Sequence, residues 1–116
     1  MLELNAFFLK RLNAPKQDLS SIVTCIKEAR GQITVDALAK KNHTSPRQLE
    51  RRFHKHIGIT PKEFINISRF QHAFSAINHN KNRKSLLDIA IEHGYYDHAH
   101  LTNEIKRYTG LPPSGL

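Results

Sequence analysis

Two stretches of the sequence carry side chains whose hydrogen-bonding groups suit the edges of nucleic-acid bases. The first begins at Ser45 and holds three arginines and a glutamate within eight residues, and the second begins at Asp97 and holds two histidines and an asparagine within seven. Arg can bond guanine through two donors, Asn can bond adenine in the same bidentate way, and Glu can accept from the cytosine amino group. No nucleophile and base pair forms a recognised catalytic motif, so these residues predict binding and not an enzyme.

The charge balance also favours a polyanionic partner. The chain has 116 residues, with 18 Lys and Arg against 10 Asp and Glu, and its isoelectric point is near 9.9. Such an excess attracts nucleic acid or an anionic membrane surface, and a solvated basic face without a partner is the simpler alternative. A chain of this length has no room for a large enzyme core. No apolar run is long enough to span a membrane, and the single cysteine, Cys25, fits a reducing cytoplasm.

The eight histidines suggest a metal site as an alternative. His93, His98 and His100 lie close together in the sequence, and Cys25 is the candidate fourth ligand. However, His98 and His100 are two positions apart, so on a helix their side chains point about 200° from each other. One ion cannot easily bind both rings, and the sequence therefore predicts no metal and no other cofactor.

Apolar periodicity and capping residues predict an all-α chain. Stripes with i, i+3 and i+4 spacing are bounded by Ser, Thr or Asp at their starts and mostly by Gly at their ends. Thr60 and Glu63 are spaced as a capping box at the start of the longest expected helix. No segment shows the alternation of a β-strand. The expected helices, each with the residues that cap and end it, cover 19–31, 34–42, 45–58, 60–78, 85–94 and 97–110.

The second half of the chain repeats the first. Leu38-Ala39 recurs 51 positions later as Ile89-Ala90, and five further residues recur 52 positions later. These five are Ser45, Leu49, Phe53, Gly58 and Pro61, which correspond to Asp97, Leu101, Ile105, Gly110 and Pro113. Each copy has a short helix with a small Ala, a tight turn and a longer capped helix, which is the helix-turn-helix pattern. Gly94 supplies the positive φ that the second turn needs, and Asn42 or His43 must supply it in the first.

With these residues the chain resembles the AraC/XylS family of transcription regulators over about residues 20–114. The residues that match the family are Leu38-Ala39, Ser45 to Leu49, Arg51, Phe53, Gly58 and Thr60-Pro61 in the first copy, Arg69 and Ala73 in the long helix, and Ile89-Ala90, His93 to Tyr95, Asp97 to Leu101, Gly110 and Pro113 in the second copy. The resemblance implies an all-α fold of two helix-turn-helix subdomains joined by a long linker helix, with two recognition helices in successive major grooves. Asn103 and Ile105 stand where the family usually has Arg and Phe. The first change affects base reading by the second subdomain, and the second is a change in the core.

The resemblance divides the chain into four parts. We expect an N-terminal extension, or the remnant of a preceding domain, over 1–16, and a first helix-turn-helix subdomain over 17–59. The linker helix follows over 60–79, and the second subdomain covers 80–116, with a C-terminal end that we expect to be truncated. Residues 1–13 are partly apolar, and a short helix, the end of a preceding domain and a tag-like start remain alternatives for them.

In a helix-turn-helix unit the second helix enters the major groove with its N-terminal part against the base edges. Leu49 and Phe53 are expected to face the core, which leaves a polar opposite face at about 100° per residue. For the first recognition helix, the expected base contacts are Arg47, Glu50 and Arg51, and the expected phosphate contacts are Ser45, Gln48, Arg52 and Lys55. For the second, the expected base contacts are His98, Thr102 and Asn103, and the expected phosphate contacts are His100, Lys106 and Arg107. A solvated helix face, in which Arg47 pairs with Glu50, and ordinary surface histidines are the alternatives.

The expected partner is double-stranded DNA. As a regulator, the protein is also expected to work with RNA polymerase and with a sensor or dimerisation domain of the same polypeptide that this chain lacks. Residues 1–58 carry a net charge of +6 and residues 59–116 carry +2, so we expect the first subdomain to bind more strongly. A linker helix of about 18 residues is about 27 Å long, which suits recognition helices roughly one DNA turn, about 34 Å, apart. The rival is a helical bundle whose basic face binds an acidic protein, but such a bundle has no use for two equivalent recognition faces.

Overall fold

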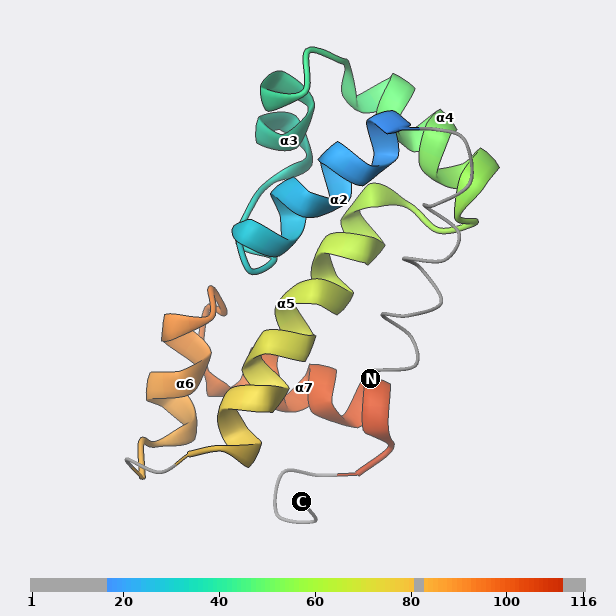
Figure 1. The fold of residues 1–116 in the computed structure, drawn as a ribbon. Coiled ribbons are helices and arrows are strands. Elements are labelled where there is room, and N and C mark those ends of the chain that lie inside the picture. The colour runs from blue at the N-terminus through green and yellow to red at the C-terminus, as the bar shows by residue number, and fades with distance from the viewer. Residues whose placement is uncertain (1–16, 81–82, 112–116) are drawn as a thin grey trace. The chain divides into compact units, whose positions relative to one another are not determined.

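The computed structural model describes residues 17–80 and 83–111, and every regular element within these ranges is a helix (Figure 1). The helices are α2 (Gln17–Glu28), α3 (Val35–Lys41), α4 (Pro46–His56), α5 (Pro61–Asn78), α6 (Leu86–Glu92) and α7 (His98–Thr109). The predicted all-α class is confirmed. The extension predicted over 1–16, and Pro113 of the repeat, lie outside the described residues.

Five of these helices begin at the capping residues that the sequence indicates. In each case the side-chain oxygen accepts a hydrogen bond from the backbone N–H three residues later, at 2.9 to 3.2 Å. The capping residues are Thr34, Ser45, Thr60, Ser85 and Asp97. Each bond satisfies one of the backbone donors that a helix N-terminus leaves without an intrahelical partner. The five starts are therefore fixed by local chemistry.

The chain forms two compact units, residues 1–68 and residues 69–116, which we call unit 1 and unit 2. The division falls between Ser68 and Arg69, so residues of α5 belong to both units. The predicted subdomain limits of 17–59, 60–79 and 80–116 follow the ends of the long helix instead, and they stay a prediction. Of the described helices, none is both long enough and apolar enough to cross a membrane.

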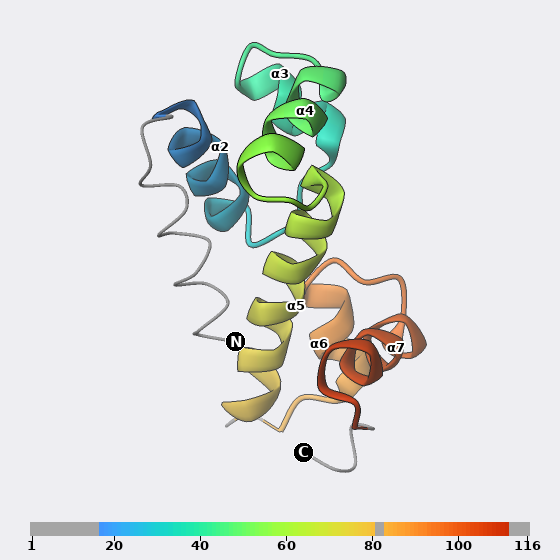
Figure 2. The same ribbon diagram turned by 90° about the vertical axis from the view of Figure 1, so that its right-hand side faces the viewer.

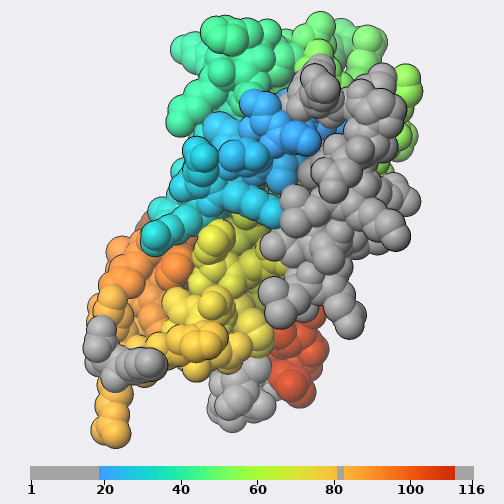
Figure 3. Space-filling view, viewed as in Figure 1, coloured from blue at the N-terminus to red at the C-terminus, as the bar shows by residue number. Residues whose placement is uncertain are grey.

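Unit 1 is built around one cluster of buried apolar side chains from α2, α3, α4 and the start of α5. Helix α3 contacts both α2 and α4, and Figure 3 shows α2 and α3 side by side on one face. The rings of Phe53 and Phe64 meet edge to face, with their centroids 5.8 Å apart. Each large apolar side chain buried here contributes about 1.5–3 kcal/mol. The cluster comprises Leu19, Ile22, Val23, Ile26, Leu38, Ala39, Leu49, Phe53, Ile57, Phe64 and Ile65.

Unit 2 repeats this arrangement with α6, α7 and the rest of α5 (Figure 2). The Phe70 ring contacts two other aromatic rings, with centroid distances of 5.5 Å to Phe74 and 4.8 Å to Tyr108. Offset and tilted ring pairs of this kind add about 0.5–1.5 kcal/mol beyond the area that they bury. The core cluster comprises Phe70, Ala73, Ile89, Ala90, Tyr95, Leu101 and Ile105.

Two features of unit 2 do not follow from apolar periodicity. On α6, Leu87 and Ile91 are 42% and 57% exposed, and the helix buries Ile89 and Ala90 instead. On α7, the charged residue Glu104 is only 7% exposed. A carboxylate at such a depth needs a charged or hydrogen-bonding neighbour, because burial without one is costly.

Candidate nucleic-acid interface

The turn between α3 and α4 brings the two helices together at a small residue. Ala39 is 1% exposed, and its carbonyl oxygen accepts from the Thr44 N–H at 3.0 Å. His43 has φ +53°, whereas Asn42 has φ −103°, so His43 provides the left-handed residue of this turn. The Asn42 side chain instead donates to the Leu38 carbonyl at 2.8 Å. A non-glycine residue in this conformation costs about 1–2 kcal/mol, which the packing of both helices offsets.

Helix α4 presents its predicted DNA-facing side chains at the surface of unit 1. Leu49 and Phe53 are fully buried, so the opposite face of α4 points to the surface. The N-terminal turn is further ordered because Thr44 Oγ1 donates to Gln48 Oε1 at 2.7 Å. The exposed residues of the predicted set are Ser45, Arg47, Gln48, Glu50, Arg51 and Lys55, while Arg52 is partly buried. Their contact with DNA stays a prediction.

The second turn has the same construction. Ala90 is fully buried, and its carbonyl oxygen accepts from the Tyr95 N–H at 2.9 Å. Gly94 has φ +85°, as the sequence predicts for this turn. Asp97 then caps α7 by accepting from the His100 N–H at 2.9 Å. Helix α7 therefore starts from a turn and a cap equivalent to those of α4.

Helix α7 carries a polar face of a different composition. Leu101 and Ile105 are fully buried, and the predicted contact residues lie away from them. The His100 ring meets the Tyr95 ring edge to face at 5.0 Å, and the Arg107 guanidinium lies 5.5 Å from the centroid of the Tyr108 ring. These ring contacts restrict both polar side chains. The exposed residues of the predicted set are His98, His100, Asn103, Lys106 and Arg107, while Thr102 is partly buried.

Beneath this face lies a group that sequence reasoning missed, Arg69, Tyr95 and Glu104, which we call the buried charge cluster. Glu104 Oε1 is 3.9 Å from Arg69 Nη2, with the two side chains 9% and 17% exposed. The Arg69 guanidinium also lies 4.7 Å from the centroid of the Tyr95 ring. Burial, and then the adjacent Glu104 carboxylate, raise the pKa of the Tyr95 phenol far above its ordinary value, although Arg69 acts in the opposite direction. The sequence analysis names Arg69 and Tyr95 only as residues that match the family. A further signal is that Arg69 lies four residues before Ala73, and so on the same face of α5.

A further exposed aromatic residue, which the sequence analysis did not consider, is Tyr96. It is 89% exposed and immediately precedes Asp97, the cap of α7.

The histidines do not assemble into a metal site within residues 17–80 and 83–111. No group of three His, Cys, Asp or Glu side chains there is arranged to hold an ion.

Comparison with known proteins places this geometry in a family. A family model described as a helix-turn-helix domain matches residues 38–116. The chain belongs to the AraC-type helix-turn-helix family. The AraC-type chain shares its fold with a crystal structure of a Chromobacterium violaceum transcriptional regulator, described as an AraC-type DNA-binding domain-containing protein. The TM-score is 0.76 at 21% sequence identity, and the match covers 85% of this chain and 88% of the other.

An uncharacterised helix-turn-helix-type transcriptional regulator from Haemophilus influenzae is 30% identical over 105 residues. The match covers 90% of this chain and 33% of that relative, so the AraC-type chain spans about a third of the relative's length. The family match assigns the chain to DNA-binding domains of transcription regulators.

Proposed function

We propose that this AraC-type chain binds duplex DNA at a specific sequence, with α4 and α7 in successive major grooves. The observation that carries the proposal is the repeated unit. Both helices have a capped start, two buried apolar residues four positions apart and an exposed polar face. The 18 residues of α5 correspond to about 27 Å, which supports a spacing of roughly one DNA turn.

In unit 1 we assign base reading to the exposed residues near the start of α4. Arg47 and Arg51 carry guanidinium groups that fit guanine, and Glu50 can accept from cytosine. The phosphate contacts are assigned to residues at the start and the margins of the helix, because hydroxyl, amide and cationic groups there hold the backbone without reading sequence. These residues are Ser45, Gln48, Arg52 and Lys55.

In unit 2 the assigned base contacts are shorter and neutral or weakly basic. Asn103 matches adenine, with Thr102 and His98 beside it. His100, Lys106 and Arg107 are assigned to phosphates. Tyr96 joins this set as a contact to the DNA backbone, because it is exposed and immediately precedes the cap of α7.

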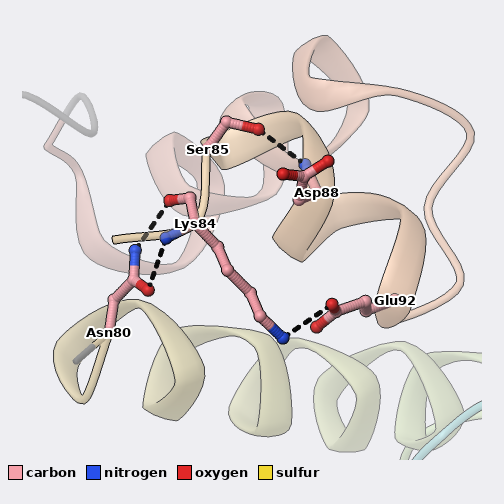
Figure 4. Close-up of polar contacts among 5 residues, drawn as sticks. All are labelled: Asn80, Lys84, Ser85, Asp88 and Glu92. Atoms are coloured by element: carbon pink, nitrogen blue, oxygen red, sulfur yellow. Dashed lines mark hydrogen bonds and ion pairs between the residues drawn. The ribbon is translucent and has the colours of Figure 1, made fainter. Parts of the chain in front are cut away.

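The proposal is tested by selecting bound duplexes from a random pool and measuring their affinity at fixed salt. We expect one enriched site with two half-sites about one helical turn apart. Arg51→Ala should remove the preference at one position of one half-site. Lys84→Ala is the charge-matched control, because Lys84 pairs with Glu92 outside both recognition helices (Figure 4). A pool without enrichment contradicts the proposal and favours an acidic protein partner instead.

We propose two further partners for the whole regulator: RNA polymerase, and a sensor or dimerisation domain in the same polypeptide. The greater length of the Haemophilus influenzae relative supports the second. Transcription from a promoter that carries the selected site, measured with and without the protein, tests the first.

A further inference from the structure

Helix α7 is held by a charge pair and by a cation–ring contact to the same guanidinium, as well as by apolar packing. Glu104 lies on α7 next to Asn103, and its carboxylate is 3.9 Å from Arg69 of α5. The Tyr95 ring, which follows the turn, covers the same guanidinium at 4.7 Å. The buried charge cluster thus joins α5, the turn and α7 within unit 2.

We infer that the buried charge cluster fixes the rotation of α7 about its own axis, and so decides which α7 side chains reach the base edges. Arg69, Tyr95 and Glu104 are then positioning residues for sequence recognition by unit 2. The inference rests on the proposed function, because it concerns how the same helix reads DNA.

Helix geometry shows why rotation matters. A helix with its side chains has a radius of about 5–6 Å, so a rotation of about 20° moves an outward side chain by about 2 Å. Hydrogen-bond distances vary by only about 0.5 Å, so such a movement breaks a contact to a base. The apolar contacts of Leu101 and Ile105 are not directional and permit small rotations. The charge pair and the cation–ring contact both depend on the distance to one guanidinium, so a rotation of α7 that moves Glu104 away from Arg69 weakens the pair.

The repeat supplies an internal comparison. The residue of α4 that corresponds to Glu104, 52 positions earlier, is Arg52, so the helix-turn-helix frame does not require an acid at this position. Unit 1 instead carries Arg51 where unit 2 has Asn103. A long, flexible Arg can adjust to a small misplacement, whereas a short Asn cannot. Helix α7, which carries the shorter base-contacting side chain Asn103, is also the helix that contributes to the buried charge cluster.

Stability alone does not account for the cluster. A buried ion pair contributes little net free energy of folding, and well-packed apolar residues of the same volume often do as well or better. In some proteins such pairs instead select one arrangement among several. An orientation role for Glu104 therefore predicts a loss of base preference that is confined to the half-site of unit 2.

The test uses two variants that preserve shape. Glu104→Gln removes the charge, and Tyr95→Phe removes only the hydroxyl. The matched control is Glu92→Gln, which removes a carboxylate of the same type from an exposed ion pair of the same unit, where Lys84 Nζ is 2.7 Å from Glu92 Oε1 (Figure 4). Each protein is selected on a random duplex pool, and its thermal unfolding is followed by circular dichroism.

We expect Glu104→Gln to weaken the base preference in the half-site of unit 2 by about tenfold, equivalent to the loss of one good base contact. Tyr95→Phe should weaken the same positions by less, since the ring stays over Arg69. The half-site of unit 1 should stay close to that of the parent, and Glu92→Gln should leave both half-sites unchanged. Because Glu104→Gln leaves the largely buried Arg69 without its carboxylate, we expect this variant to unfold at a lower temperature than the parent.

Three results would overturn the inference. The first is an unchanged preference for the unit 2 half-site in folded Glu104→Gln. The second is a loss of both half-sites together with a lower unfolding temperature, which would give the cluster a purely structural role. The third applies if Glu104→Gln does not fold. In that case an unchanged preference for the unit 2 half-site in Tyr95→Phe would overturn the inference. A parent chain that selects no sequence at all refutes the proposed function itself.

Discussion

At the scale of single residues, Arg51 and Asn103 are equivalent positions of the two copies with different chemistry. Both are exposed, one on α4 and the other on α7, and they lie 52 residues apart. The guanidinium fork of Arg fits the O6 and N7 of guanine, whereas the Asn amide fits the N6 and N7 of adenine. We expect Asn103→Arg to strengthen DNA binding and to shift the preferred base in the unit 2 half-site from adenine toward guanine.

A binding selection on the parent and on Asn103→Arg measures this shift. Asn103→Gln is the matched control, because it keeps the amide and so the preference for adenine. If all three proteins prefer the same base, residue 103 does not read DNA and the recognition face of α7 has been misplaced.

Tyr95 gives a prediction that is independent of DNA. Its burial raises the pKa of the phenol in the folded state, whereas in the unfolded chain the phenol ionises near its ordinary value of about 10. Above that pH the unfolded state holds fewer protons than the folded state, so stability falls as pH rises, by about 1.4 kcal/mol per pH unit. Below about pH 10 the contribution is fully present.

We expect the free energy of unfolding in urea to fall more steeply for the parent than for Tyr95→Phe as the pH rises from about 9 to about 11. Every other side chain is the same in both proteins, so its contribution cancels in the comparison. Parallel curves would show that the Tyr95 phenol ionises freely in the folded protein.

At the scale of elements, the sequence predicts those helix starts and turns that are determined by residues close together in the chain. Ser45 and Asp97 start their helices through bonds to residues three positions on, and Gly94 sets its turn through its own φ. The burial of Glu104 could not be predicted, because it depends on Arg69, which lies 35 residues earlier in the chain and meets it only after folding. Likewise, the outward position of Ile91 depends on which side of α6 meets α7.

The cap of α7 can be tested by itself. Removal of the Asp97 carboxylate leaves the His100 N–H without its acceptor at 2.9 Å. We expect Asp97→Ala to lower the free energy of unfolding by about 1 kcal/mol, and Asp97→Asn to retain most of it, because Asn is also a good capping residue. Urea unfolding compares the three proteins. Equal losses for Ala and Asn would mean that the charge at the helix N-terminus matters and the hydrogen bond does not.

At the scale of the whole molecule, the charge is divided unequally. Unit 1 holds twelve Lys and Arg against six Asp and Glu, and unit 2 holds six against four, which gives net charges of +6 and +2. We therefore expect Arg51→Ala to cost about 1–3 kcal/mol of binding and to relax one position of its half-site, and His98→Ala to cost less. Both variants are measured on one selected duplex at fixed salt. A larger loss for His98→Ala would reverse the order of the two units.

The same charge makes DNA affinity depend on salt. Each phosphate that a Lys or Arg neutralises releases condensed counterions, and log K falls with log salt at about 0.9 per phosphate. Helices α4 and α7 offer four exposed or partly buried cations in the proposed phosphate contacts: Arg52, Lys55, Lys106 and Arg107. If all four reach phosphates, the slope is about −4. Lys106→Ala should make it shallower by about one while leaving the selected sequence unchanged, because a phosphate contact reads no base. Affinities measured across a salt series give both slopes. A parent slope near −2 would mean that only one recognition helix engages DNA, and a changed base preference in Lys106→Ala would move that residue from the phosphates to the bases.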